Sequence, residues 1–438
     1  MLSRYSSWLT NVRAMQLFQL FRQGGVILTA ILLAQSGLPT AQLGQYEMLL
    51  FIGTLLSFAW LTGFLQSLLG LYPRLTKESQ VQLKGQAWLT FCLLSAVVAG
   101  ALLLFPDQIV RAFTQKGGIP FTILFAFFLL LNWPAYLQEH FYLLDDRPRA
   151  IFTYGFLSAT AQLLLIAGPP WLGWDFTWSF RGLCLLGLAK WSWLTVYVFQ
   201  HSTIRWNRRL WQAWWRPARP LVLYALLGIL VQSFGPWFVG YYFAGDEAQF
   251  ALYRYGSKEL PLVMALAGAF STALIPVVAA DLTTGLEQLR RKMQSLLHLI
   301  FPLTIVLLLT SRWWFVWVFT EDFSASVPLF NTFLLTTIWH LWFVRTVLVA
   351  LQDNRWQPLF VIAAGVAMVI FCILFTPRFG LVGIALGTVL AYGVEKVLLT
   401  IYLWRRHGLS PASYTPLGWF LGYSVALLGA YLISMQYA

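Results

Sequence analysis

The sequence predicts an all-α membrane protein that crosses the bilayer many times, and two observations predict it. First, 59% of the 438 residues are hydrophobic and only 10% are charged, whereas a soluble domain carries about 25% charged residues. Second, apolar runs of about 20 residues, the length that a helix needs to cross the hydrocarbon core, recur along the whole chain. A water-soluble globular fold is therefore excluded, and about thirteen transmembrane helices are expected.

The predicted spans follow one another with short connections. They are expected at residues 15–38, 47–72, 85–105, 119–139, 150–167, 179–199, 220–243, 252–280, 293–311, 327–351, 358–376, 380–404 and 415–434. The eighth span contains Pro261 and Pro276. Because proline removes a backbone donor from a helix, this span is expected to kink or to begin outside the membrane.

Basic residues in the loops predict the orientation, since cytoplasmic loops carry an excess of Lys and Arg. The loops form two alternating sets, one on each side of the membrane. The set that includes the N-terminus carries 18 such residues, and the other set carries 4. The larger set is Arg4, Arg13, Arg74, Lys77, Lys84, Arg147, Arg149, Arg205, Arg208, Arg209, Arg216, Arg219, Arg290, Arg291, Lys292, Arg355, Arg405 and Arg406. We therefore expect a cytoplasmic N-terminus and, with thirteen spans, a C-terminus outside.

The chain repeats itself at an offset of about 205–208 residues. The matches are 41–46 with 248–253, 113–114 with 319–320, 144–147 with 352–355, and 194–197 with 399–402. Each half holds six spans, an even number, so both halves enter the membrane in the same orientation. We therefore predict two parallel six-helix lobes around a central cavity, an N-lobe at 1–199 and a C-lobe at 220–404. An extra span is expected at 405–438.

Residues 200–219 join the predicted lobes and hold five arginines and no acidic residue. Four tryptophans, Trp206, Trp211, Trp214 and Trp215, alternate with them. This pattern is typical of a helix in the membrane interface, with indoles at headgroup depth and arginines toward lipid phosphates. Arginines among aromatics also occur in nucleic-acid-binding proteins, but this segment is short and tethered at both ends by membrane helices. No nucleic-acid partner is expected.

Charged residues inside the spans are the candidates for a substrate site, because such a charge usually faces a cavity or a partner. Seven cations and four acids lie there, which favours an anionic substrate. They are Arg22, Arg181, Lys190, Arg254, Lys258, Arg345 and Lys396, and Glu47, Glu139, Glu259 and Glu395.

Four of these cations are candidate substrate contacts. Arg22 and Arg345 lie about two turns from the cytoplasmic ends of their spans, and the planar fork of arginine donors suits a phosphate. Their alternative role is snorkelling to the interface or pairing with Glu139. Arg254 and Lys258, four residues apart, are expected on one helical face. There they contact substrate or form an ion-pair cluster with neighbouring acids.

Glu259, Glu395 and Lys396 are the candidate residues for coupling to a proton or a sodium ion, because a buried carboxyl can exchange a proton. Ion pairs inside the helix bundle are the alternative for Glu395, Lys396 and the mid-span Lys190. Gly235 and Pro236 form a candidate hinge in the seventh span, and close helix packing is the alternative role of this glycine.

Two equivalent loops carry an Asp-x-Arg turn, at Asp145 and Arg147 and at Asp353 and Arg355. Either each pair closes its own turn, or the pairs form a cytoplasmic latch between the halves. The local pair is the favoured interpretation.

Motifs for enzymatic chemistry are missing from the sequence. It has no nucleotide-binding glycine loop and no nucleophile elbow, and its three cysteines show no metal-binding or disulfide pattern. We expect a protein that is not an enzyme and binds no metal or other cofactor.

Several segments resemble the polysaccharide transporters, or oligosaccharide flippases, of the multidrug/oligosaccharidyl-lipid/polysaccharide (MOP) superfamily. The resemblance covers about residues 10–405. The segments that carry it are Arg22-Gln23-Gly24-Gly25, Leu43-Gly44-Gln45-Tyr46-Glu47, Leu252-Tyr253-Arg254-Tyr255-Gly256, Glu259-Leu260-Pro261-Leu262, Thr272-Ala273-Leu274-Ile275-Pro276 and Gly380-Leu381-Val382-Gly383-Ile384-Ala385.

The resemblance implies a MATE-like secondary transporter in a bacterial inner membrane. It would flip a polyprenyl-pyrophosphate-linked oligosaccharide, such as an O-antigen unit of lipopolysaccharide, to the outer leaflet by alternating access. It maps Arg22 and Arg345 to the anionic headgroup and suggests H⁺ or Na⁺ coupling. The alternatives are a cation-coupled exporter of small organic molecules, a lipid II-type flippase and a membrane glycosyltransferase. The exporter is disfavoured because the first and seventh spans carry Gln35 and Gln232 but no acid.

Overall fold

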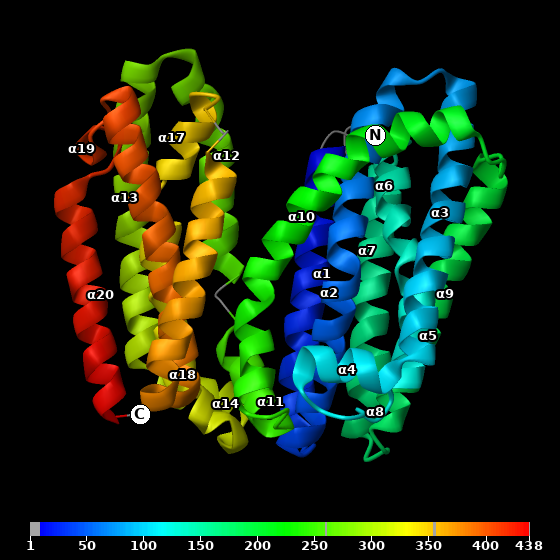
Figure 1. The fold of residues 1–438 in the computed structure, drawn as a ribbon, viewed down its shortest axis with the longest axis horizontal. Coiled ribbons are helices and arrows are strands. Elements are labelled where there is room, and N and C mark those ends of the chain that lie inside the picture. Colours follow the sequence, from blue (N-terminus) through cyan, green and yellow to red (C-terminus); the bar gives the residue numbers. More distant parts are fainter. Residues whose placement is uncertain (1–8, 259–260, 354–355, 438) are drawn as a thin grey trace, which may run out of the picture. The chain divides into compact units, whose positions relative to one another are not determined.

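The computed structural model describes residues 9–258, 261–353 and 356–437, and these form two compact units (Figure 1). Unit 1 comprises the described residues up to Ser233 together with Gly240–Ala248. Unit 2 comprises Phe234–Val239 and the described residues from Gln249 onward. Every element in the described part of the chain is helical, as predicted.

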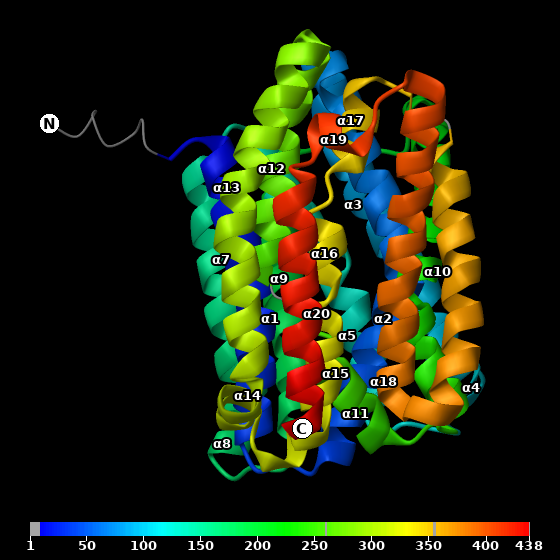
Figure 2. The same cartoon turned by 90° about the vertical axis from the view of Figure 1, so that its left-hand side faces the viewer.

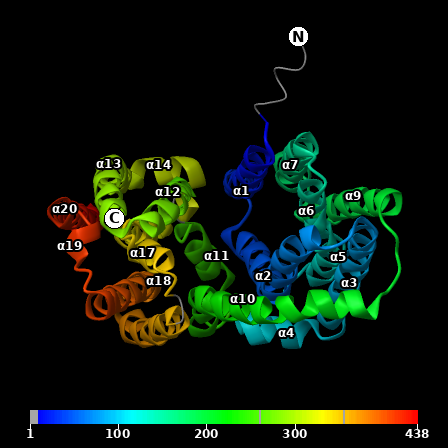
Figure 3. The same ribbon diagram turned by 90° about the horizontal axis from the view of Figure 1, so that it is seen from above.

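Unit 1 is built from helices that run roughly parallel to one another, most of them seen end-on in Figure 3. Helix α1 packs along α7, and α9 packs along α5 and α3. The elements are α1 (Asn11–Gln35), α2 (Thr40–Leu71), η2 (Tyr72–Arg74), α3 (Lys77–Leu104), α4 (Pro106–Thr114), α5 (Thr122–Asn132), η3 (Pro134–Tyr136), α6 (Leu137–Leu144), α7 (Pro148–Gln162), the π-helical turn η4 (Leu163–Ala167), α8 (Gly168–Trp171), α9 (Thr177–His201) and the larger part of α10 (Arg208–Tyr242).

Unit 2 has the same kind of architecture, and Figure 2 shows its last helix, α20, lying beside α13. Its elements are a short part of α10, α11 (Glu247–Gly256), α12 (Pro261–Ala280), α13 (Leu282–Leu309), α14 (Ser311–Phe319), η5 (Glu321–Ser326), α15 (Val327–Leu334), α16 (Thr336–His340), α17 (Val344–Ala350), α18 (Gln357–His407), α19 (Pro411–Tyr414) and α20 (Leu417–Tyr437).

Ten helices in the described residues are long and apolar enough to cross a membrane. One of them, α18, carries two of the thirteen predicted spans, because its backbone leaves the helical conformation at Gly380. The predicted span 119–139 is a series of shorter helices, α5, η3 and α6, interrupted near Pro134. The multi-pass character is thus confirmed, whereas the count of thirteen and the parallel relation of the lobes remain predictions.

Large apolar side chains on the outer surface of both units explain why the structure requires lipid. Leu164 and Phe199 in unit 1 are 67% and 65% exposed, and Leu374 and Leu432 in unit 2 are 63% and 64% exposed. Helices that are hydrophobic on every side satisfy their backbone internally and place these side chains in hydrocarbon.

The internal repeat is visible in the backbone of the turns. Residues with a left-handed conformation recur at offsets of 205–208 residues. The pairs are Gly37 with Gly245, Gln115 with Thr320, Asp146 with Gln352, and Gly173 with Gly380. A positive φ is uncommon outside glycine, so its recurrence in the two non-glycine pairs indicates that the chain turns at equivalent positions in both halves.

Helix α11 ends at Gly256, which corrects one expectation. Arg254 lies in the last turn of α11, whereas Ser257 and Lys258 lie beyond the end of this helix and are not helical. Arg254 and Lys258 therefore do not share one helical face.

Candidate functional site

A cavity of about 210 Å³ lies inside unit 1, among α1, α2, α5, α6, α7 and α9. Most of its wall is apolar or aromatic. Its polar lining includes Arg22, Glu47, Asn132, Tyr136, Glu139, Gln162 and Lys190. A cavity that combines charge with an apolar wall inside a membrane protein marks a functional site by default.

Glu139 is the most deeply placed charged group of this cavity, with 3% exposure. Its carboxylate interacts electrostatically with Arg22 of α1, His140 of α6 and Lys190 of α9. The Lys190 Nζ donates a hydrogen bond to Asn132 Oδ1 at 3.1 Å and lies 5.9 Å from the Tyr136 ring centroid. Two cations thus share one cavity with two buried acids, Glu139 and Glu47.

Arg22 lines this cavity, as its proposed substrate contact requires. Its Nη2 donates to Gln19 Oε1 at 2.6 Å, and its guanidinium lies 6.0 Å from the Phe18 ring centroid. The side chain is exposed, so its guanidinium is accessible to an incoming group. The role of Arg22 in binding remains a prediction.

Unit 2 brings Arg345 of α17 and Glu395 of α18 together. The Arg345 Nη2 lies 2.5 Å from Glu395 Oε1, and 45% of the Arg345 side chain is exposed, against 11% for Glu395. Lys396 interacts electrostatically with both groups. The pairing of Arg345 with Glu395 was not predicted from the sequence. The repeat nevertheless relates the two sites, since Arg345 and Lys396 match Glu139 and Lys190 at an offset of 206 residues.

The remaining predicted site residues are dispersed. The Lys258 Nζ lies over the Tyr255 ring, 4.0 Å from its centroid, and Arg254 is half-buried. Glu259 lies outside the described residues. Gly235 and Pro236 lie within α10, beside the point where the chain passes from unit 1 to unit 2.

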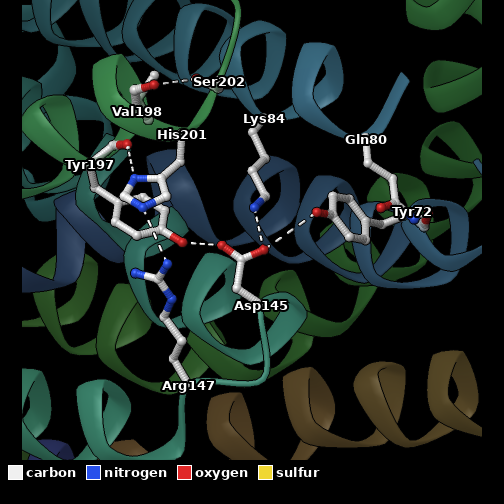
Figure 4. A network of polar contacts seen from close by, with 9 residues as sticks. All are labelled: Tyr72, Gln80, Lys84, Asp145, Arg147, Tyr197, Val198, His201 and Ser202. Carbon is white, nitrogen blue, oxygen red and sulfur yellow. Dashed lines mark hydrogen bonds and ion pairs between the residues drawn. The ribbon is translucent and has the colours of Figure 1, made fainter. Parts of the chain in front are cut away.

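The Asp-x-Arg turn of unit 1 is part of a larger polar network (Figure 4). Asp145 binds Lys84 of α3 and the Tyr197 hydroxyl of α9, and the Tyr72 hydroxyl lies 3.5 Å from it. Arg147 instead contacts His201, with 3.2 Å between Nη2 and Nε2. The cation that Asp145 binds is therefore Lys84, which sequence spacing alone did not suggest.

Unit 2 repeats part of this network at the equivalent turn. The Tyr402 hydroxyl donates to Asp353 Oδ2 at 2.6 Å, and His407 Nε2 lies 3.0 Å from the same oxygen. Asp353, Tyr402 and His407 correspond in the repeat to Asp145, Tyr197 and His201. Arg355 lies outside the described residues. Each network ties the sixth predicted span of its half, at its end, to the loop after the fourth predicted span of that half.

The fold defined by these helices is that of the MOP superfamily transporters. It is shared with a lipid II flippase, MurJ, in an inward closed conformation (TM-score 0.72, 14% identity, 96% of this chain and 92% of that chain). An inward-facing multidrug resistance MATE family transporter also matches (TM-score 0.63, 15% identity, 88% and 93%).

A MOP superfamily transporter from Pyrococcus furiosus, described with a binding pocket of reverse polarity, is similar too (TM-score 0.61, 14% identity, 91% and 94%). These three proteins are described as a flippase and two transporters. No protein-family model and no curated protein matches the sequence. Within the described residues, no group of three or more His, Cys, Asp and Glu side chains is placed to hold a metal ion.

Proposed function

We propose that this protein is a secondary transporter that flips a polyprenyl-pyrophosphate-linked oligosaccharide from the inner to the outer leaflet of a bacterial inner membrane. The product would serve the assembly of a surface polysaccharide such as O-antigen. The main support is the cavity of unit 1, where two cations, Arg22 and Lys190, lie in one polar and aromatic lining together with the buried carboxyls of Glu47 and Glu139. The fold shared with the MurJ lipid II flippase is consistent with a lipid-linked substrate.

The charges of the unit 1 cavity suit a pyrophosphate. Arginine offers a planar pair of donors and lysine a compact positive charge, and both bind phosphate oxygens. Arg22 is exposed, whereas Lys190 is half-buried and held by Asn132. We infer that Arg22 meets the headgroup first and that Lys190 provides the second positive charge.

In unit 2, Arg345 is the corresponding candidate. Its contact with Glu395 leaves 45% of the side chain exposed, so the guanidinium can also meet an anion.

The other residues singled out from the sequence keep their proposed roles. Arg254 and Lys258 stay secondary candidates for substrate contact. Glu259, Glu395 and Lys396 remain the proposed groups for H⁺ or Na⁺ coupling, and Gly235 and Pro236 remain the proposed hinge for alternating access. The N-terminus is proposed to be cytoplasmic.

A second candidate function is the cation-coupled export of small organic molecules. The unit 1 cavity favours it in one respect, because two carboxyls, Glu47 and Glu139, lie among aromatic side chains that include Tyr46, Trp133 and Tyr154. Aromatic faces and a carboxylate attract organic cations. The shared fold of the MATE family transporter is compatible with this alternative.

Ligand-induced stabilisation of the purified protein tests these functions, because a ligand that binds the native state raises its apparent stability. The ligands are a polyprenyl-pyrophosphate oligosaccharide, a lipid II-type pyrophosphate lipid and a panel of organic cations. We expect the oligosaccharide lipid to stabilise the protein most. Arg22→Ala and Lys190→Ala should each weaken its binding roughly tenfold to 100-fold, the usual range for a hydrogen bond to a charged group.

Arg181→Ala is the matched control, because Arg181 lies on the same helix as Lys190 but is exposed and does not line the cavity. Its binding should equal that of the unsubstituted protein. Stabilisation by organic cations alone, lost in Glu139→Gln, would favour the exporter. Equal binding of the oligosaccharide lipid by the Arg22→Ala, Lys190→Ala and Arg181→Ala proteins would refute the proposed role of the unit 1 cavity.

A further inference from the structure

A basic and aromatic platform lies on unit 1, outside the cavity just described. Its residues are 203–219, the coil after α9 and the first turns of α10. Arg205, Arg208, Arg209, Arg216 and Arg219 are all exposed there, and the segment contains no acidic residue. Five exposed positive charges without a counter-charge in the segment form a strong site for anions.

The platform is fixed to unit 1 by side-chain hydrogen bonds and by a close approach of its backbone to α3. Gln86 Nε2 donates to the Asn207 carbonyl at 3.3 Å, and Asn207 Nδ2 donates to Gln82 Oε1 at 3.3 Å. A Cβ at position 85 would lie 2.4 Å from the Thr203 carbonyl oxygen, so the close approach depends on Gly85. The Asn207 side chain also accepts the backbone N–H groups of residues 209 and 210, which starts α10.

One face of α10 anchors the platform in the core of unit 1. Leu210, Trp214 and Ala218, spaced four apart, are all buried, and Trp214 has no exposed surface. The Trp214 Nε1 donates to the Phe64 carbonyl at 3.2 Å, and the Ser67 hydroxyl donates to the Trp214 carbonyl at 3.0 Å. The opposite face, with its arginines, is therefore held toward solvent.

The other tryptophans form a stack along the edge of the platform. The Trp206 and Trp211 rings lie 5.2 Å apart, and the Trp211 and Trp215 rings lie 6.0 Å apart at an interplanar angle of 5°. The outer members remain accessible, with Trp206 51% and Trp215 37% exposed. Indole rings with an apolar body and one polar N–H prefer the depth of lipid headgroups.

We propose that this platform is a binding site for anionic phospholipids of the phosphatidylglycerol type, separate from the substrate site. The arginines bind the headgroup phosphates, and Trp206 and Trp215 lie among the glycerol backbones and upper acyl chains. The apolar span that continues from the platform within α10 places it at the membrane boundary. None of its arginines lines the unit 1 cavity, so the proposal is independent of the transported substrate.

The experiment measures thermal stability of the full chain in neutral detergent micelles titrated with phosphatidylglycerol or phosphatidylcholine. We expect phosphatidylglycerol to stabilise the protein and phosphatidylcholine to have little effect. The triple variant Arg205→Gln, Arg208→Gln, Arg209→Gln should bind phosphatidylglycerol more weakly, by roughly fivefold per arginine removed. High salt should have the same effect, because it screens exposed charges.

The matched control is a second triple variant, Arg290→Gln, Arg291→Gln, Lys292→Gln. These three cations are exposed like the platform arginines, but no tryptophan adjoins them. It should retain the phosphatidylglycerol response. Equal losses in the two triple variants would show general charge attraction and overturn the proposal, as would equal stabilisation by inorganic phosphate. If the platform triple variant is unstable in phosphatidylcholine micelles, Arg208→Gln alone provides the comparison, and an unchanged response in that variant would contradict the site.

Discussion

At the scale of single residues, the charged groups inside this protein are organised as pairs and clusters. Lys84 with Asp145 and Arg345 with Glu395 are partly or largely removed from solvent. An ion pair in such a place loses hydration, and its attraction offsets this cost only while both partners are present. Removal of one partner is therefore more harmful than removal of both.

Asp145→Ala tests this reasoning. The substitution leaves the Lys84 ammonium, whose side chain is 5% exposed, without its carboxylate. We expect a destabilisation of about 3 kcal/mol, measured as a lower unfolding temperature in detergent. The double variant Asp145→Ala, Lys84→Met should recover much of the loss. Glu287→Ala, which removes an exposed carboxylate on α13, is the control and should change stability little. Wild-type stability of Asp145→Ala would contradict a structural role for the network.

At the scale of elements, α10 is the helix that belongs to both units. Its residues up to Ser233 lie in unit 1, and Phe234–Val239 lie in unit 2. Gly235 is packed tightly within unit 2, because a Cβ there would lie 2.2 Å from the Tyr253 hydroxyl oxygen. This contact gives the glycine a packing role that exists whether or not the helix also bends during transport.

Gly235→Ala should destabilise the protein by about 1–3 kcal/mol, the usual cost of overfilling a packed site. Tyr253→Phe removes the oxygen that the new methyl group would meet. The double variant should therefore be about as stable as Tyr253→Phe alone. Stability is measured by thermal unfolding, and transport by export of the glycan. Restored stability with export still lost would support the hinge. Restored stability together with restored export would leave Gly235 a packing residue only.

Polar groups also define the start of α13 between the predicted spans. Asp281 caps this helix, and its side chain accepts the backbone N–H groups of Thr283 and Thr284 at 3.0 and 3.3 Å. The hydrogen bonds from Thr284 hold the pKa of Asp281 below its ordinary value. The folded state thus favours the carboxylate, and this contribution to stability is lost only as the pH falls through that lowered pKa.

At the scale of the whole molecule, the repeat places turns at equivalent positions in each half and gives each half a related polar network. The left-handed residues at offsets of 205–208 and the matched residues Asp145 and Asp353 are independent signs of it. The shared MOP fold is consistent with such a duplicated architecture.

The predicted orientation is tested with reporter fusions. A phosphatase that is active only outside the cytoplasm, fused after residue 438, should be active if there are thirteen spans and a cytoplasmic N-terminus. The same reporter fused after Ser410, in the loop between α18 and α20, should be inactive. The reverse result would contradict the combination of thirteen spans with a cytoplasmic N-terminus, and activity in neither fusion would mean that α20 does not cross the membrane.

Much of the fold could be predicted from the sequence because lipid imposes a simple rule. A long apolar run must form a helix, since no water is present to satisfy its backbone. The runs, the short loops and the repeat therefore predicted a multi-pass helical protein with Arg22 and Lys190 inside its spans. Pro261 correctly marked an irregular eighth span, although the end of α11 at Gly256 separated Arg254 from Lys258.

Composition and order alone thus determined the class of protein and which charged residues fall within its apolar spans. Only the tertiary structure decided which charges meet: Lys84 with Asp145, Arg345 with Glu395, and Glu139 with the cations of the unit 1 cavity. The physical reason is that a helix in lipid is apolar on nearly every face, so its sequence carries no periodic signal for the side that packs inward. That side is set by contacts between helices far apart in the chain.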